Sequence, residues 1–86
     1  MGFFDNQAKL IREARERLGL KQSDISKRFQ FTSPQLISNV ERGLCAFPAD
    51  RARKLCNILK IDYDAGFKKA VLADCWARYN RKGDAA

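Results

Sequence analysis

The sequence predicts an all-α protein, a bundle of five helices, and three observations support this fold class. Apolar residues recur three and four positions apart, the spacing that places them on one face of a helix. Glycine or proline interrupts this spacing at short intervals, as expected where short helices end and begin. The 86 residues, 45% of them hydrophobic, suffice for one modest core. We therefore expect a single domain, residues 1–86, with helices at about 6–18, 22–29, 34–42, 49–60 and 64–80.

The first helix is expected to begin at Asp5 or Asn6, because either side chain can accept hydrogen bonds from the free backbone N–H groups of a helix start. Gly19 then marks its end. Phe3 and Phe4 precede the cap, and at least one of them should fold back onto the core. The inward face of this helix consists of Leu10, Ile11, Ala14 and Leu18.

A tight turn joins the second helix to the third. Ile25 and Phe29 lie four positions apart, so both should point in the same direction. Ser33 followed by Pro34 is typical of a helix start. The serine hydroxyl can cap N–H groups there, and proline lacks a donor that the first helical position does not need. Gly43 ends the third helix.

The third helix has two unlike faces. Its buried stripe consists of Leu36, Ile37 and Val40. The opposite face carries Gln35, Ser38 and Asn39, which are short, neutral, hydrogen-bonding side chains. Side-chain amides donate and accept together, which is what adenine requires at N6 and N7 in the major groove of DNA. We therefore expect Gln35 and Asn39 to contact bases, with Ser38 as a secondary candidate.

Pro48 is expected to open the fourth helix, and Asp62 or Asp64 to cap the fifth. The buried side of the fourth helix consists of Ala52, Leu55, Cys56 and Leu59. The last residues, Arg81 to Ala86, have the composition of a frayed tail.

The fifth helix is apolar on two sides. The side expected to pack on the core consists of Phe67, Ala70 and Val71. The roughly opposite side consists of Leu72, Trp76 and Tyr79. Because tryptophan and tyrosine are common at the centres of protein interfaces, the second side predicts a homodimer. The alternative is that it packs on the chain's own Phe3 and Phe4.

The composition favours a polyanionic partner and argues against an enzyme. The net charge is +7, and both halves of the chain are basic. Without histidine there is no Ser-His-Asp triad, no Cys-His dyad and no histidine-bearing metal site, so we expect no catalytic residue, metal or cofactor. Three widely spaced cysteines, Cys45, Cys56 and Cys75, favour a reducing cytoplasm. No apolar run approaches the roughly 18–20 residues that span a bilayer, so no membrane role is expected.

Several positions in the central segment have a recognisable spacing, namely Gln22, Ile25, Phe29, Ser33, Pro34, Gln35, Ser38, Glu41, Arg42 and Gly43. These positions resemble the helix-turn-helix of the phage-repressor/Cro-like (XRE-type) DNA-binding family. The resemblance covers roughly residues 8–61 and implies a lambda-repressor-like bundle. One departure is Gln30, where the family often has glycine in the turn.

The resemblance also implies roles for individual polar residues. Arg15 would form an ion pair with Glu41, which would fix the first helix against the end of the recognition helix. Pro34 stands where relatives often carry a polar side chain, and it either touches a thymine methyl group or only sets the helix start. The candidates for DNA phosphate contacts are Gln22, Ser33, Arg42, Arg51 and Lys54.

Together these features predict a sequence-specific transcriptional regulator, in the first place a repressor, located in the cytoplasm of a bacterium. It would bind double-stranded DNA through the major groove, as a homodimer on an inverted-repeat operator. The alternative is an antitoxin or adaptor that uses the same fold to hold a protein partner through the face formed by Leu72, Trp76 and Tyr79.

Overall fold

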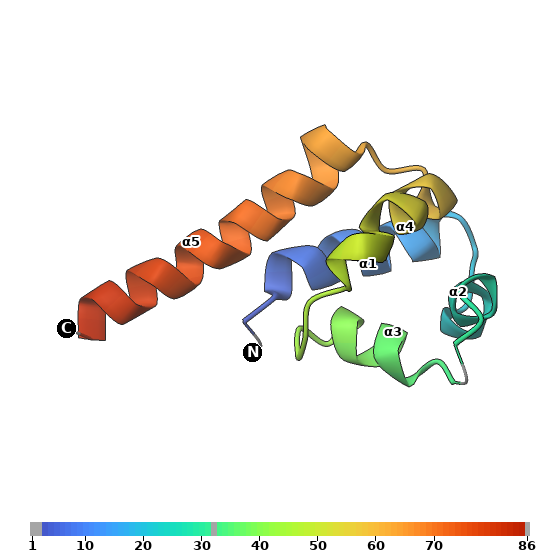
Figure 1. Cartoon of the computed structure of the whole chain (residues 1–86), viewed down its shortest axis with the longest axis horizontal. Coiled ribbons are helices and arrows are strands. Elements are labelled where there is room, and N and C mark those ends of the chain that lie inside the picture. The colour runs from blue at the N-terminus through green and yellow to red at the C-terminus, as the bar shows by residue number, and fades with distance from the viewer. Residues whose placement is uncertain (1–2, 32, 86) are drawn as a thin grey trace.

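The computed structural model describes residues 3–31 and 33–85, and every regular element in these residues is a helix (Figure 1). The α-helices are α1 (Asp5–Arg17), α2 (Gln22–Arg28), α3 (Gln35–Glu41), α4 (Ala52–Leu59) and α5 (Lys68–Ala85). A 3-10 turn, η1 (Ala49–Arg51), precedes α4, and a π-helical turn, η2 (Tyr63–Phe67), precedes α5. The predicted all-α, five-helix fold is confirmed.

The core lies where the first four helices meet the start of the fifth. Its largest fully buried apolar side chains include Ile11, Ile25, Ile37, Val40, Leu55 and Leu59. These residues occupy the positions that the apolar spacing assigns to buried faces, and burying a side chain of this size contributes about 1.5–3 kcal/mol. Two of them, Ile37 and Val40, belong to α3, so the core holds that short helix by one face.

The start of α1 differs from the expectation. Phe4 occupies the cap position, and no side chain at that position caps the helix, so neither Asp5 nor Asn6 has the predicted role. The backbone N–H groups of Asn6 and Gln7 donate instead to the carboxylate of Asp74, at 2.8 and 3.1 Å. A residue of the last helix therefore caps the first helix, which spacing within one helix cannot reveal.

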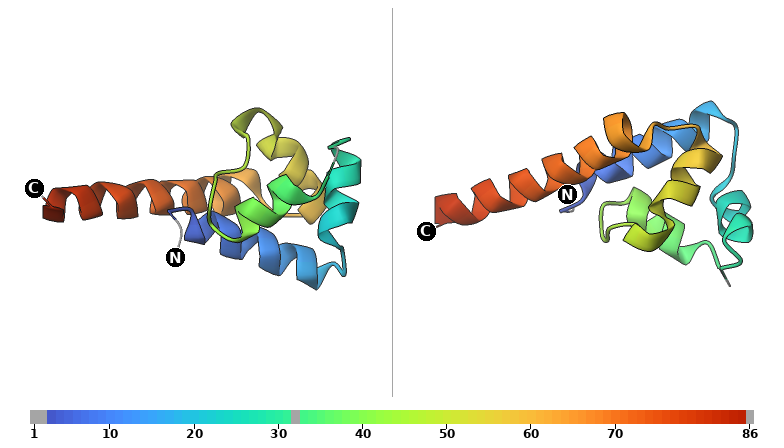
Figure 2. Two further views of the ribbon diagram at one scale, coloured as in Figure 1. Left: turned by 90° about the horizontal axis from the view of Figure 1, so that it is seen from below. Right: turned by 45° about the horizontal axis from the view of Figure 1, so that its top comes forward.

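The fifth helix is longer than expected. Its backbone is helical to Ala85, so the predicted tail is wrong up to that residue, and Ala86 lies outside the described residues. Of the two expected caps, Asp62 accepts a hydrogen bond from the Ala65 backbone N–H at 2.7 Å. In Figures 1 and 2, α5 runs past the start of α1 and extends beyond the other helices.

Candidate nucleic-acid interface

The outer face of α3 presents two side-chain amides that are bonded to each other. Gln35 is exposed and Asn39 is half-buried, and the Gln35 Nε2 donates to Asn39 Oδ1 at 2.9 Å. The opposite face is fixed, since Ile37 and Val40 have no exposed surface. The two amides therefore stand on a helix that cannot roll without opening the core, and their hydrogen bond restricts their rotamers before any ligand arrives.

The remaining base-contact candidates lie on the same short helix or at its start. Pro34 occupies the cap position and Gln35 is the first helical residue, one position later than predicted. The Ser33 hydroxyl accepts a hydrogen bond from the Gln35 backbone N–H at 3.3 Å, so this serine supports the helix start. Ser33 and Pro34 are exposed, while Ser38 is half-buried beside the amides.

The end of α3 is held by a salt bridge to α1. Arg15 donates to Glu41 through Nε at 2.6 Å and through Nη2 at 2.9 Å, and its Nη1 donates to the Leu20 carbonyl at 2.9 Å. Glu41 is only 4% exposed, and its hydrogen bond raises the pKa of Arg15 above the ordinary value. The ion pair implied by the resemblance is thus present, with the bidentate geometry that fixes orientation best.

Gln22 lies inside this network rather than apart from it. It is half-buried, and its Nε2 donates to Glu41 Oε1 at 3.2 Å. The first residue of α2 is therefore joined to the last residue of α3, which couples the two helices on either side of the turn. One N–H of the amide remains for the predicted phosphate contact.

Two of the predicted phosphate contacts are cations held on aromatic rings near the turn. The Arg51 guanidinium lies 5.2 Å from the centre of the Phe31 ring. The Lys54 Nζ lies 5.0 Å from the centre of the Phe29 ring and donates to the Arg28 carbonyl at 2.9 Å. Both cations are exposed yet positioned, which lowers the entropy lost when they bind an anion.

Arg42 lies at the other end of the recognition helix. It is exposed and follows α3 directly, at the C-cap. Since α3 has seven residues and is about 10 Å long, Arg42 and the Arg51–Phe31 pair bracket its two ends. Exposed positive charge therefore stands on both sides of the amide pair.

The turn between α2 and α3 contains a strained residue. Gln30 has a φ of 58°, in the left-handed region, which glycine enters without steric cost. Its neighbours Phe29 and Phe31 stack, with ring centres 5.3 Å apart and planes within 10°. The glycine often found here in the resembling family would satisfy the same backbone, so Gln30 departs in residue type but not in conformation.

We expect Gln30→Gly to stabilise the protein. A non-glycine residue in this conformation is strained by about 1–2 kcal/mol, and glycine's greater freedom in the unfolded chain offsets part of the gain. The free energy of unfolding from urea titration should therefore rise by about 0.5–1 kcal/mol. Lys27→Gly, within the exposed part of α2, is the matched control and should lower it by about 1 kcal/mol. A decrease in both variants would contradict the assignment of strain to Gln30.

Two residues of this arrangement, Phe31 and Asp74, are not predicted from the sequence. The Arg51 guanidinium lies over the Phe31 ring, but a single aromatic residue in a turn has no sequence spacing that would predict this contact. Asp74 could have been found from its position, because it follows Phe67 and Val71 at i, i+4, i+7 spacing on the inward side of α5. A carboxylate on an apolar stripe requires a buried partner, and here that partner is the start of α1.

Comparison with known proteins agrees with this geometry. A model of the helix-turn-helix family matches residues 11–65. The chain belongs to this family. As an XRE-type helix-turn-helix protein it is a DNA-binding regulator. No curated protein and no solved structure matches the chain significantly.

The helix-turn-helix match ends before α5 begins. Asp74 and the exposed side of α5 therefore lie outside the segment that the family model describes. In the part of the chain that the structure describes, no helix is both long and apolar enough to cross a membrane.

Proposed function

We propose that this protein is a repressor of transcription that binds an inverted-repeat operator in the major groove of double-stranded DNA, as a homodimer in the bacterial cytoplasm. One observation carries the proposal: Gln35 and Asn39 form an outward amide pair on a helix that the core and the Arg15–Glu41 salt bridge hold in place. A helix held on one face and polar on the other is suited to enter the groove without rearrangement.

Affinity and specificity come from different residues in this proposal. Exposed cations at both ends of α3, together with the net charge of +7, neutralise phosphates and release counterions without distinguishing sequences. Gln35 and Asn39 distinguish bases, and each bidentate contact with adenine supplies about 1–3 kcal/mol of discrimination. Ser38 and Pro34 lie beside them and complete the surface that contacts the bases, whereas Ser33 and Gln22 bind phosphates of the DNA backbone.

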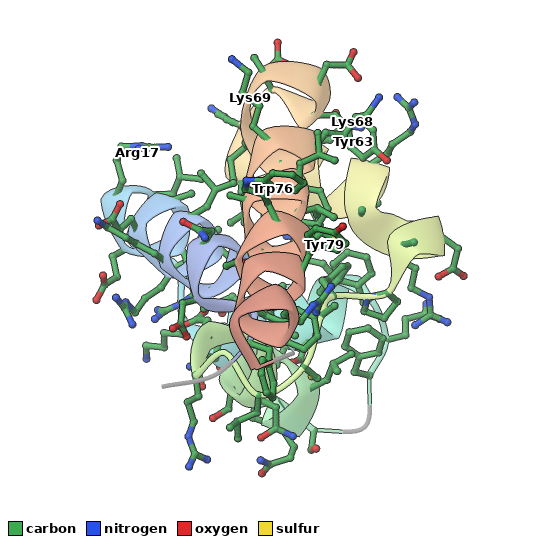
Figure 3. The ribbon with its side chains drawn as sticks, turned by 90° about the vertical axis from the view of Figure 1, so that its left-hand side faces the viewer. Arg17, Tyr63, Lys68, Lys69, Trp76 and Tyr79 are labelled. Carbon is green, nitrogen blue, oxygen red and sulfur yellow. The ribbon has the colours of Figure 1, made fainter. Side chains whose placement is uncertain are left out.

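The homodimer is proposed to form through the exposed side of α5. Leu72, Trp76 and Tyr79 are 65%, 64% and 68% exposed, so most of their apolar surface is accessible to a second chain. The rings of Trp76 and Tyr79 stack, with centres 5.4 Å apart and planes within 10°. Figure 3 shows Tyr79 on the same side of α5 as Tyr63, with Arg17 of α1 on the other side.

This apolar side of α5 continues into a cavity. The cavity has a volume of about 370 Å³, and Leu72 belongs both to its wall and to the exposed stripe. Its other large apolar lining residues are Phe47, Tyr63, Phe67 and Val71. Stripe and cavity together form a contiguous apolar surface, of the kind that marks an interaction site in a protein that is otherwise highly charged.

Selection of bound duplexes from a random pool tests the proposed function. At moderate salt we expect enrichment of an inverted repeat whose half-sites are about 34 Å apart, one helical turn of DNA. Enrichment of single half-sites only would reject the homodimer. No enrichment at all would favour the second candidate, an antitoxin or adaptor that holds a protein partner through the α5 stripe, for which the exposed Trp76 is the supporting observation.

Sedimentation of a Trp76 variant tests the interface. Because tryptophans at interface centres commonly contribute about 2 kcal/mol or more, Trp76→Ala should raise the dimer dissociation constant by about 30-fold. Leu44→Ala is the control, since Leu44 is also an exposed large apolar residue but lies in the loop after α3. A monomer mass for the wild type at all concentrations would reject the interface.

A further inference from the structure

Asp74 is the most buried charged residue in the part of the chain that the structure describes, and its bonds all go to the start of α1. It is 1% exposed. Its Oδ1 accepts from the Asn6 backbone N–H at 2.8 Å and from Asn6 Nδ2 at 2.9 Å, and its Oδ2 accepts from the Gln7 backbone N–H at 3.1 Å. Both carboxylate oxygens are thus used, and the negative charge meets the positive end of the helix dipole.

This contact differs in kind from the apolar packing around it. Apolar burial has no preferred direction, and interdigitated side chains hold the crossing angle of two helices only within a scatter of about 15–20°. Hydrogen bonds are directional, and three of them converging on one carboxylate define both position and angle. One turn further along α5, the Arg78 guanidinium lies 4.6 Å from the centre of the Phe4 ring, which adds a second contact to the same segment.

The opposite end of α1 carries the other polar anchor. Arg15 bonds Glu41, the last residue of α3, through two nitrogens. From Asn6 to Arg15 the helix rises by about 13 Å. Polar contacts therefore hold α1 at both ends, to α5 at its start and to the recognition helix α3 at its end.

We propose that Asp74 is a positioning residue, which sets the angle between α5 and the recognition helix and thereby the half-site spacing that the dimer accepts. The second part rests on the proposed function, because half-site spacing has meaning only for a dimer formed through α5. In such a dimer the two recognition helices are related through α5, α1 and α3 of each subunit, and a tilt at Asp74 is carried to the DNA end of the molecule. Replacing Asp74 should therefore leave the contacts between one subunit and its half-site unchanged.

The first measurement tests the angle without DNA, and its result does not depend on whether the chain dimerises. Spin labels are attached to cysteines at Gln35 in α3 and Ala77 in α5, with Cys45 and Cys75 replaced by serine and the buried Cys56 retained. Labelled chains are diluted with unlabelled chains, so that only distances within one chain are counted. We expect a narrow distance distribution for the parent and at least a two-fold broader one for Asp74→Ala, with Asp74→Asn between them. Unchanged widths would overturn the proposal.

Two further variants keep this measurement decisive. Asp64→Ala is the matched control, because Asp64 is an exposed carboxylate near the start of α5 whose ion pair is with Lys68 at 3.6 Å. It should leave the distribution unchanged, and broadening in this variant as well would overturn the proposal. If Asp74→Ala is not folded by circular dichroism, Asn6→Ala removes one of the three bonds and should broaden the distribution to a smaller extent.

The second measurement tests the consequence for DNA. Affinities are compared for a single half-site and for operators with one base pair inserted or removed between half-sites, which rotates them by roughly 34°. The parent should lose about ten-fold or more in affinity on such a change, and Asp74→Ala about three-fold or less, while half-site affinity stays within about two-fold. A variant that keeps the spacing preference despite a broadened distance distribution would overturn the link to spacing. A parent without spacing preference would overturn the proposed dimer, while the distance measurement would still decide the role of Asp74 in the fold.

Discussion

Arg15→Met is expected to lower the free energy of unfolding by about 3–5 kcal/mol, because it leaves a buried carboxylate without its cation. The substitution removes both guanidinium bonds from the carboxylate of Glu41, which is 4% exposed, and among the described residues leaves it the 3.2 Å hydrogen bond from Gln22. It also removes the donor to the Leu20 carbonyl. Urea titration followed by circular dichroism measures the loss. The total free energy of unfolding of such a small domain is itself only about 5–15 kcal/mol, so the loss is a large part of it.

The double variant Arg15→Met, Glu41→Leu distinguishes a buried pair from two independent charges. Because the isolated charge is the main source of the loss, removing Glu41 as well should recover most of the stability. DNA binding should not recover to the same degree, since the apolar pair lacks the directional bonds that orient α3. A loss below about 1 kcal/mol in the single variant would mean that the pair behaves as an exposed one.

Asn39→Ala is expected to relax sequence preference while leaving the fold intact. Asn39 is half-buried on the outer face of α3 and its side chain accepts a hydrogen bond from Gln35 of the same face, so the core is unaffected. Discrimination at one or two base positions should fall by about 1–3 kcal/mol, roughly 5- to 150-fold in relative affinity. Sequencing of duplexes selected by wild type and variant measures the change, and Gln35→Ala should relax preference at overlapping positions, because the two amides are bonded to each other.

Arg42→Ala is the matched control for this specificity experiment. The residue is exposed at the end of the same helix and carries a full charge instead of an amide. Its removal should weaken binding to all sequences alike and reduce the slope of log affinity against log salt by about 1. If Asn39→Ala behaved in the same manner, the amide would contribute to affinity but not to base preference.

Much of the fold and of the candidate site follows from local spacing. Ile37 and Val40 had to be buried for α3 to be amphipathic, and that choice alone turns Gln35 and Asn39 outward. Family resemblance supplied the Arg15–Glu41 pair, which no periodicity indicates. Predictions of this kind depend on residues within one or two helical turns of each other, or on a motif that the family shares.

The parts that escaped prediction depend on contacts between distant segments. The cap of α1 comes from a residue 68 positions away, so local cap rules selected Asp5 and Asn6 instead. The end of α5 was placed at residue 80 because glycine and charge dominate the segment after it, yet the helix propagates to Ala85. Arg51 was predicted as a candidate for a DNA phosphate contact, but the Phe31 ring on which its guanidinium lies was not predicted.

The bond between Gln35 and Asn39 has a consequence for how new operators could arise. Each amide's orientation depends on the other, so altering one also releases its neighbour and changes what that neighbour prefers. A code with one residue for one base would then not hold on this helix. Evolution or engineering toward a different operator would have to replace Gln35 and Asn39 together. Variants with only one of the two replaced would bind many operator sequences with little preference among them.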